Sequence, residues 1–264
     1  PYAVYHEDYN KIPDAEKIAD ILDQDDTITH VSMVHSETTS GILNDICEVT
    51  RVVKAKKRTM IVDAMSSFGG VDIPVEDLGI DFIISSANKC IQGVPGFSFI
   101  IAKKDALEKT KGQARSLSLD LYDQWETMNK DGKWRFTSPT HTVLAFAKAM
   151  EELEEEGGIL ARSKRYYDNN REIIRRFKEM GLETYIDEEH QGPIITTFFF
   201  PEDAGFTFEE MYEYIKDRGY AIYPGKVTEA ATFRIGNIGE IYQEDVDALC
   251  AIMKEFLEEK NHGK

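Results

Sequence analysis

The chain has 264 residues, 42% of them hydrophobic and 30% charged, which is typical of a globular protein with a buried core. Its formal net charge of −17 argues against binding to nucleic acids or to anionic membranes, because both need clustered Lys and Arg side chains. No signal peptide is visible, and no apolar run approaches transmembrane length.

Three cysteines lie far apart in the sequence, at Cys47, Cys90 and Cys250. Their odd number and wide spacing indicate neither a disulfide framework nor a CxxC metal pair. We therefore expect no metal site, and we expect a reducing, cytoplasmic compartment.

The first half of the chain alternates between helical and strand patterns. Helices are predicted over residues 14–23 and 43–57, and strands over 29–35, 59–65, 81–87 and 97–103. The strands are apolar throughout rather than at every second residue. This pattern predicts an α/β fold with a mainly parallel sheet that is covered on both faces.

The second half has a different pattern, which predicts a small α+β unit. Two long helices are expected within residues 139–158 and 159–181, followed by a strand (193–200), a helix (207–218), two short strands (220–223 and 232–236) and a final helix (242–259). We place the change of domain near residues 140–160. The predicted domains are 1–145, which is the large domain, and 146–264, which is the small one.

Polar side chains follow four of the predicted strands. Ligands of open α/β sheets collect at the carboxyl ends of the strands. Each polar group could be an ordinary cap or turn, but together they suggest a site with a carboxylate, an amine, hydroxyls and an arginine. The four stretches are HSETTSG (35–41), DAMSS (63–67), SSANK (85–89) and RIG (234–236).

Asp63 and Lys89 follow two of these strands and are suited to pyridoxal phosphate chemistry. In such enzymes a lysine forms a Schiff base with the cofactor, and an aspartate faces the pyridinium nitrogen and keeps it protonated. From spacing alone, a helix cap for Asp63 and a surface loop position for Lys89 explain the pattern equally well.

Seven stretches of the sequence together resemble the 2-aminoethylphosphonate–pyruvate aminotransferases. This family is a branch of the class V, fold-type I pyridoxal phosphate aminotransferases. The resemblance runs from about residue 10 to the C-terminus and is most specific over residues 30–145. The stretches are MVHSETTSG (33–41), IVDAMSSFGG (61–70), ISSANKCIQGVPGF (84–97), RSLSLDLYDQW (115–125), KWRFTSPTHT (133–142), YPGK (223–226) and FRIGNIGE (233–240).

The resemblance implies catalytic roles for two residues. Lys89 matches the Schiff-base lysine, which also moves the proton of the substrate, and Asp63 matches the partner of the pyridinium nitrogen. Arg234 matches the arginine that grips the carboxylate of the keto acid in a bidentate pair. The reaction implied is the transfer of an amino group from 2-aminoethylphosphonate to pyruvate in a homodimer.

The other residues implied by the resemblance hold the cofactor. Met65 packs against the ring, and Thr38 bonds its 3-oxygen, with Ser40 as a second candidate. The phosphate contacts are Ser86, Asn88 and, from the neighbouring subunit, Thr137. Two further cations, Lys226 and Arg135, are weaker candidates for substrate attraction, and a surface salt bridge explains each of them better.

This sequence departs from the family at its beginning. The family has a glycine-rich phosphate loop and an aromatic residue that stacks on the ring, and neither occurs before Pro13. We therefore expect an N-terminally truncated chain, with an incomplete large domain, that is inactive alone and holds pyridoxal phosphate poorly. The alternative functions are a class V aminotransferase with another amino donor and an inactive folded fragment of the enzyme.

Overall fold

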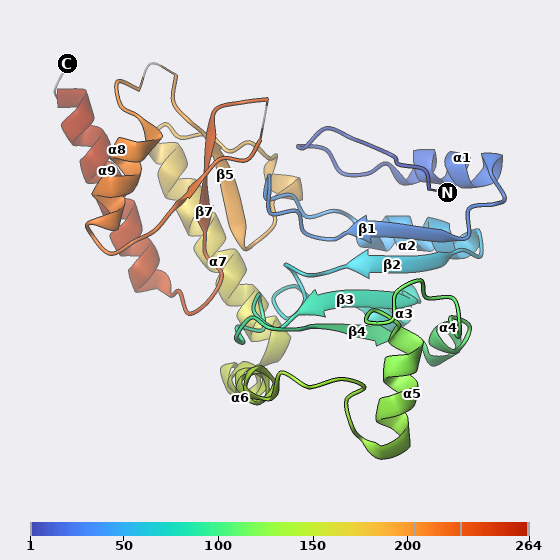
Figure 1. Ribbon diagram of the computed structural model, residues 1–264. Helices are drawn as coiled ribbons and strands as arrows, with labels where there is room; N and C mark the ends of the chain where they lie inside the picture. The colour runs from blue at the N-terminus through green and yellow to red at the C-terminus, as the bar shows by residue number, and fades with distance from the viewer. Residues whose placement is uncertain (1, 203, 228, 263–264) are drawn as a thin grey trace.

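The structure is a computed structural model that describes residues 2–202, 204–227 and 229–262. Figure 1 shows two lobes, each built on its own sheet, with the long helix α7 (Gly158–Glu179) running from one lobe to the other. No helix of the described residues combines the length and the apolar character needed to cross a bilayer.

The first lobe contains a four-stranded sheet of order β1-β2-β3-β4. β1 (His30–Val34), β2 (Thr59–Asp63) and β3 (Phe82–Ser86) are parallel, whereas β4 (Ser98–Ala102) pairs antiparallel with β3. The carboxyl ends of the three parallel strands therefore share one edge of the sheet. In Figure 1 that edge faces the second lobe.

Helices pack around this sheet through their apolar faces. Asp14 and Asp45 begin α1 and α2, because each carboxylate accepts two backbone N–H groups of the first helical turn. Val49 and Val53 of α2 pack on Met60 of β2 to form the core of the lobe. The helices of this lobe are α1 (Ala15–Gln24), α2 (Ile46–Ala55), α3 (Val75–Leu78), α4 (Lys104–Glu108) and α5 (Leu121–Asp131).

The second lobe contains an antiparallel sheet of order β5-β7-β6, formed by β5 (Ile195–Phe199), β6 (Tyr223–Pro224) and β7 (Thr232–Gly236). Its core forms where Phe177 of α7 packs against Phe198 and Phe233 of the sheet. Helix α6 (Thr140–Glu156) precedes α7. A 3₁₀ turn, η1 (Glu188–His190), and two helices complete the chain, α8 (Phe208–Lys216) and α9 (Gln243–His262).

The predicted elements of both halves are confirmed, with three differences. Helices α3, α4 and α5 were not predicted, and the expected strand 220–223 is displaced to Tyr223–Pro224, because the chain at Tyr220 still bonds back to Ile215 of α8. The sheet is also less covered than expected, since alternate residues of β1 are exposed. The predicted domain boundary at 145/146 falls inside α6 and stays a prediction.

Candidate active site

Asp63 and Lys89 lie at the shared carboxyl edge of the parallel strands. Asp63 is the last residue of β2, in register with Val34 of β1 and Ile84 of β3. Lys89 follows three residues after β3 ends at Ser86. Since β2 and β3 are parallel neighbours, the topology places the carboxylate and the amine at the same edge, as the sequence predicted.

The Asp63 carboxylate is held by its own turn. Its Oδ1 accepts the backbone N–H of Met65 at 2.8 Å, which is an Asx turn. Among the described residues, none donates a hydrogen bond to Oδ2 or pairs with the carboxylate in a salt bridge. The local role of a turn cap is therefore present, and one oxygen stays available for a ligand.

Lys89 sits in a closed turn after β3. The turn is closed by two backbone bonds of 2.8 Å, from Gln92 N–H to the Lys89 carbonyl and from Gly93 N–H to the Ala87 carbonyl. A Cβ at Gly93 would lie 2.6 Å from the Ala87 carbonyl oxygen, so the turn needs glycine there. Lys89 is half-buried, and its side-chain amine has no hydrogen bond or ion pair with the described residues, which leaves the amine free to react.

A cavity of about 370 Å³ opens beside this turn. Asn88 and Lys89 line it together with Glu152 of α6 and the segment Ile238–Glu240 that follows β7. Of the predicted site residues, only these two line the cavity. The cavity therefore lies between the Lys89 turn of the first lobe and elements of the second lobe.

Two hydroxyls of the predicted site lack a partner among the described residues. Ser86 Oγ and Ser40 Oγ are both buried and make no hydrogen bond with the described residues. An unpaired buried hydroxyl costs free energy, because it has lost water without gaining a partner. Both oxygens are suited to a polar ligand that reaches the edge of the sheet.

Arg234 on β7 contacts the loop that follows β1. Its Nη1 donates to the Thr38 carbonyl at 2.9 Å, its Nε donates to the Pro224 carbonyl at 3.0 Å, and the guanidinium lies 5.6 Å from the ring centre of Tyr223. No described carboxylate pairs with it, and burial lowers the pKa of Arg234. A buried cation of this kind is suited to a ligand carboxylate.

The loop after β1 is fixed against β5. A Cβ at Gly41 would lie 2.6 Å from the Ile195 carbonyl oxygen, and Gly41 has a φ of 95°, so glycine is required at this close approach. Gln191 Nε2 donates to the Gly41 carbonyl at 3.2 Å and to the Ile195 carbonyl at 2.9 Å. The structure thus joins Thr38 and Arg234 at the junction of the lobes.

Thr137 lies apart from these groups, on the exposed segment between α5 and α6. Of the two weaker candidates, Arg135 forms the expected salt bridge, with Asp123 at 3.1 Å, and also donates to the Leu117 carbonyl. Lys226 is exposed. Arg135 therefore has a structural role on the surface. Thr137 does not contribute to the candidate site of its own chain.

Two titratable groups close to the site are buried. His35 contacts Ser67 Oγ through Nδ1 at 2.9 Å, and burial lowers its pKa to about 4, so its ring is neutral at pH 7. Burial raises the pKa of Cys90 to about 12. The Cys90 thiol therefore stays protonated and unreactive although it adjoins Lys89.

Two side chains of α7 that hold the Lys89 turn were not predicted from the sequence. Arg162 donates to the carbonyls of Cys90 and Ile91, at 3.0 and 3.2 Å, and Tyr166 accepts a hydrogen bond from Gln92 at 2.6 Å. Both α7 residues are fully buried. Their spacing of four residues on one helix face was the only signal in the sequence.

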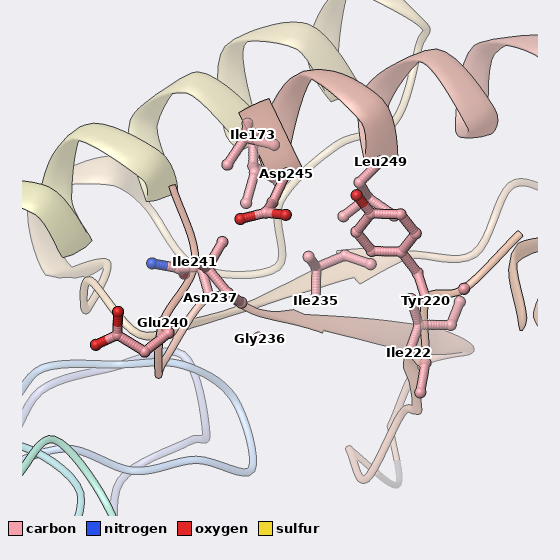
Figure 2. Close-up of a pocket in the computed structure, with 13 residues that line it drawn as sticks. Ile173, Tyr220, Ile222, Ile235, Gly236, Asn237, Glu240, Ile241, Asp245 and Leu249 are labelled. Atoms are coloured by element: carbon pink, nitrogen blue, oxygen red, sulfur yellow. The ribbon is translucent and has the colours of Figure 1, made fainter. Parts of the chain in front are cut away.

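Another cavity, of about 240 Å³, lies in the second lobe between α7, α9 and β7 (Figure 2). Figure 2 shows mainly apolar side chains around it, such as Ile173, Ile235 and Leu249. Two carboxylates, Glu240 and Asp245, also line it, and Asp245 accepts the Tyr242 N–H at 2.9 Å and so begins α9. This cavity contains none of the predicted site residues.

The residues at the sheet edge fit pyridoxal phosphate. The fit rests on an unpaired amine at Lys89, a carboxylate oxygen of Asp63 without a described partner and the orphaned Ser86 hydroxyl. These are the groups that such a cofactor needs for its aldehyde, its ring nitrogen and its phosphate.

The comparisons agree with this chemistry. Residues 4–249 match the model of the family described as aminotransferase class-V. The chain belongs to the class V aminotransferase family, whose cofactor is pyridoxal phosphate and whose fold is that of the fold-type I aminotransferases.

Two curated relatives show which members of the family this chain is similar to. The chain is 59% identical, over 98% of its length, to a 2-aminoethylphosphonate–pyruvate transaminase of Lysinibacillus sphaericus, and 57% identical, over 90%, to one of Bacillus cytotoxicus. It spans 70% of the first relative and 66% of the second.

Solved structures show the same fold. The pyridoxamine–pyruvate aminotransferase of Mesorhizobium loti superposes with a TM-score of 0.86 at 24% identity, and an aspartate aminotransferase of Thermus thermophilus with 0.82 at 25%. The alignments cover 96% and 95% of this chain, and 66% and 69% of those structures.

Proposed function

We propose that this protein transfers the amino group of 2-aminoethylphosphonate to pyruvate, giving phosphonoacetaldehyde and alanine, with Lys89 as the residue that binds the cofactor. The observation that carries the proposal is the placement of Lys89 and Asp63 at one sheet edge, with no described ion-pair partner for either. The names of the relatives, at 56–59% identity, support the choice of the two substrates.

Six residues of the same subunit are proposed to contact the cofactor besides Lys89. Pyridoxal phosphate supplies an aldehyde that takes up the amino group and a ring that withdraws electrons from the substrate carbon. Asp63 faces the ring nitrogen with the carboxylate oxygen that its Asx turn leaves open. Met65 covers the ring, Thr38 and Ser40 approach its 3-oxygen, and Ser86 and Asn88 contact the phosphate.

Lys89 is proposed to move the proton of the reaction. The Lys89 amine would hold the aldehyde of the cofactor in the resting protein and would be a free base once substrate is bound. As that base it would take the proton from the substrate carbon that bears nitrogen and pass it to the aldehyde carbon of the cofactor, and it would do the reverse in the second half of the cycle. The closed turn from Ala87 to Gly93 keeps this amine at the sheet edge.

Arg234 is proposed to bind the carboxylate of pyruvate. Among the described residues, none accepts a hydrogen bond from its Nη2, and Nη1 has a second hydrogen beside the one that reaches Thr38. The guanidinium can therefore present two parallel donors to a carboxylate. A local cation is needed, since the net charge of −17 repels an anionic substrate.

A homodimer is the proposed assembly, with Thr137 contacting the phosphate of the neighbouring subunit. Support comes from large apolar side chains that are exposed on both sides of Thr137, which a second copy would cover. They are Leu117, Leu119, Trp134, Phe136 and Leu144. A cytoplasmic location, expected from the pattern of the cysteines, also remains a prediction.

Steady-state rates test the amino donor directly. The protein, expressed from its natural start codon and loaded with pyridoxal phosphate, is assayed for alanine formed from pyruvate. We expect 2-aminoethylphosphonate to give the highest kcat/KM, well above that of serine or aspartate. A higher value with an amino acid donor would favour a related class V aminotransferase instead.

A further inference from the structure

The turn that carries Lys89 contains a strained residue. Gln92 has a φ of 66°, in the left-handed region that residues with a side chain rarely adopt. The strain lies three residues after Lys89, and the Gln92 N–H closes the turn on the Lys89 carbonyl. Backbone strain persists only where the surrounding structure holds it.

The Gln92 side chain is held by a buried tyrosine of α7. Its Nε2 donates to the Tyr166 hydroxyl at 2.6 Å, and Tyr166 has no exposed surface. The same phenolic oxygen accepts the backbone N–H of Gly239 at 3.3 Å. Tyr166 thus bridges the Lys89 turn to the segment that follows β7, the strand of Arg234.

A second set of bonds parallels this bridge. Glu156 binds Arg162 and Arg165, with both N–O distances 2.7 Å. Arg162 holds the carbonyls of the Lys89 turn, whereas Arg165 donates to the Gly239 carbonyl at 2.8 Å. Arg162 thus holds the peptide group that precedes Gln92, whereas Tyr166 is the described partner of the Gln92 side chain.

We propose that Gln92 and Tyr166 are positioning residues for Lys89. The hydrogen bond between them holds the turn in its left-handed conformation and so fixes the Lys89 amine at the sheet edge. The inference rests on the proposed role of Lys89 and extends it to two residues that do not touch the reacting atoms. Without the bond, the turn relaxes away from the strained φ and the amine moves with it.

Three variants test the proposal, each made in the protein expressed from its natural start codon. Tyr166→Phe removes only the phenolic oxygen, Gln92→Ala removes its donor, and the double variant removes both. Tyr167→Phe is the matched control, because Tyr167 is the adjacent, half-buried tyrosine of α7 and its hydroxyl has no described partner.

Gln92→Ala is expected to lower kcat about 3- to 10-fold, the range that one net hydrogen bond allows, and Tyr166→Phe at least as much, because it also removes the acceptor of the Gly239 N–H. The pH midpoint of the visible absorption of the cofactor-loaded protein should shift by about 0.5–1 pH unit, which is the same factor in proton affinity. The double variant should be no worse than the more severe single one, since both changes break the same bond. Tyr167→Phe should match the wild type.

Two results would overturn the positioning role. One is a lower melting temperature in Tyr166→Phe with unchanged kcat and absorption midpoint, which would show a purely structural contact. The other is a double variant whose losses multiply, which would show that the residues act independently. Lys89→Ala is measured alongside: if it retains turnover, the proposed function fails, and that result is distinct from a failure of the positioning role.

Discussion

Replacing Arg234 by alanine should weaken the binding of pyruvate far more than the binding of 2-aminoethylphosphonate. Arg234 is 5% exposed, and the described bonds of its guanidinium go to two carbonyls, so no described carboxylate neutralises its charge. A hydrogen bond to a charged group contributes about 1.5–3 kcal/mol, which corresponds to roughly a ten- to hundredfold loss of affinity for the keto acid. Arg234→Lys should recover only part of it, because lysine lacks the planar fork.

Arg218→Ala provides a matched control for this experiment. Arg218 also lies over a tyrosine ring, that of Tyr214, and also donates to a backbone carbonyl, but it is exposed at the end of α8. The assay measures KM for each substrate with the other saturating. Equal losses for pyruvate and 2-aminoethylphosphonate in Arg234→Ala, or an equal effect of Arg218→Ala, would refute the assigned role.

Three further predictions concern stability and cofactor binding. His35 is neutral in the folded protein down to about pH 4, whereas it takes up a proton near pH 6.5 when unfolded, so the free energy of unfolding should fall by up to about 3 kcal/mol as the pH drops from 6.5 to 4. In urea titrations, the free energy of unfolding of His35→Asn should fall less than that of the wild type over that range. A fall in His35→Asn as large as in His30→Asn, the control at an exposed site, would contradict the assignment. Ser86→Ala should leave the melting temperature of the cofactor-free protein unchanged or raise it, since the Ser86 hydroxyl has no described partner. It should lower the affinity for pyridoxal phosphate roughly tenfold in a fluorescence titration. An unchanged affinity would exclude a phosphate contact. Thr137→Ala should lower the affinity for the cofactor only at protein concentrations at which sedimentation shows a dimer. An equal loss of affinity in the monomer would place the hydroxyl in the site of its own subunit.

Most of the fold could be predicted from local patterns. The parallel strands are short apolar runs bounded by turn residues, and the long helices α6 and α7 have amphipathic periods that are followed by Gly157 and Gly181. Helix α5 was missed because its apolar content is low and only Tyr122 is buried on it. The displaced β6 is two residues long and is defined by pairing with β7, which no local pattern encodes.

The site could be predicted as far as side chains that follow strands. Asp63 and Lys89 were found because parallel topology brings strand ends together. The residues that hold the Lys89 turn could not be found in this way, since Tyr166 and Arg162 lie more than seventy residues further along the chain and act through backbone and side-chain bonds. The left-handed conformation of Gln92 is equally invisible, because glycine and not glutamine is the usual residue there.

The central claim is that Lys89 is the residue that binds the cofactor, and reduction with borohydride tests it most directly. The protein, expressed from its natural start codon and loaded with pyridoxal phosphate, is reduced, digested and analysed by mass spectrometry. We predict a single modified peptide with the cofactor fixed to the Lys89 nitrogen, and none in Lys89→Ala. Stoichiometric modification of another lysine, or an adduct that persists in Lys89→Ala, would contradict the account.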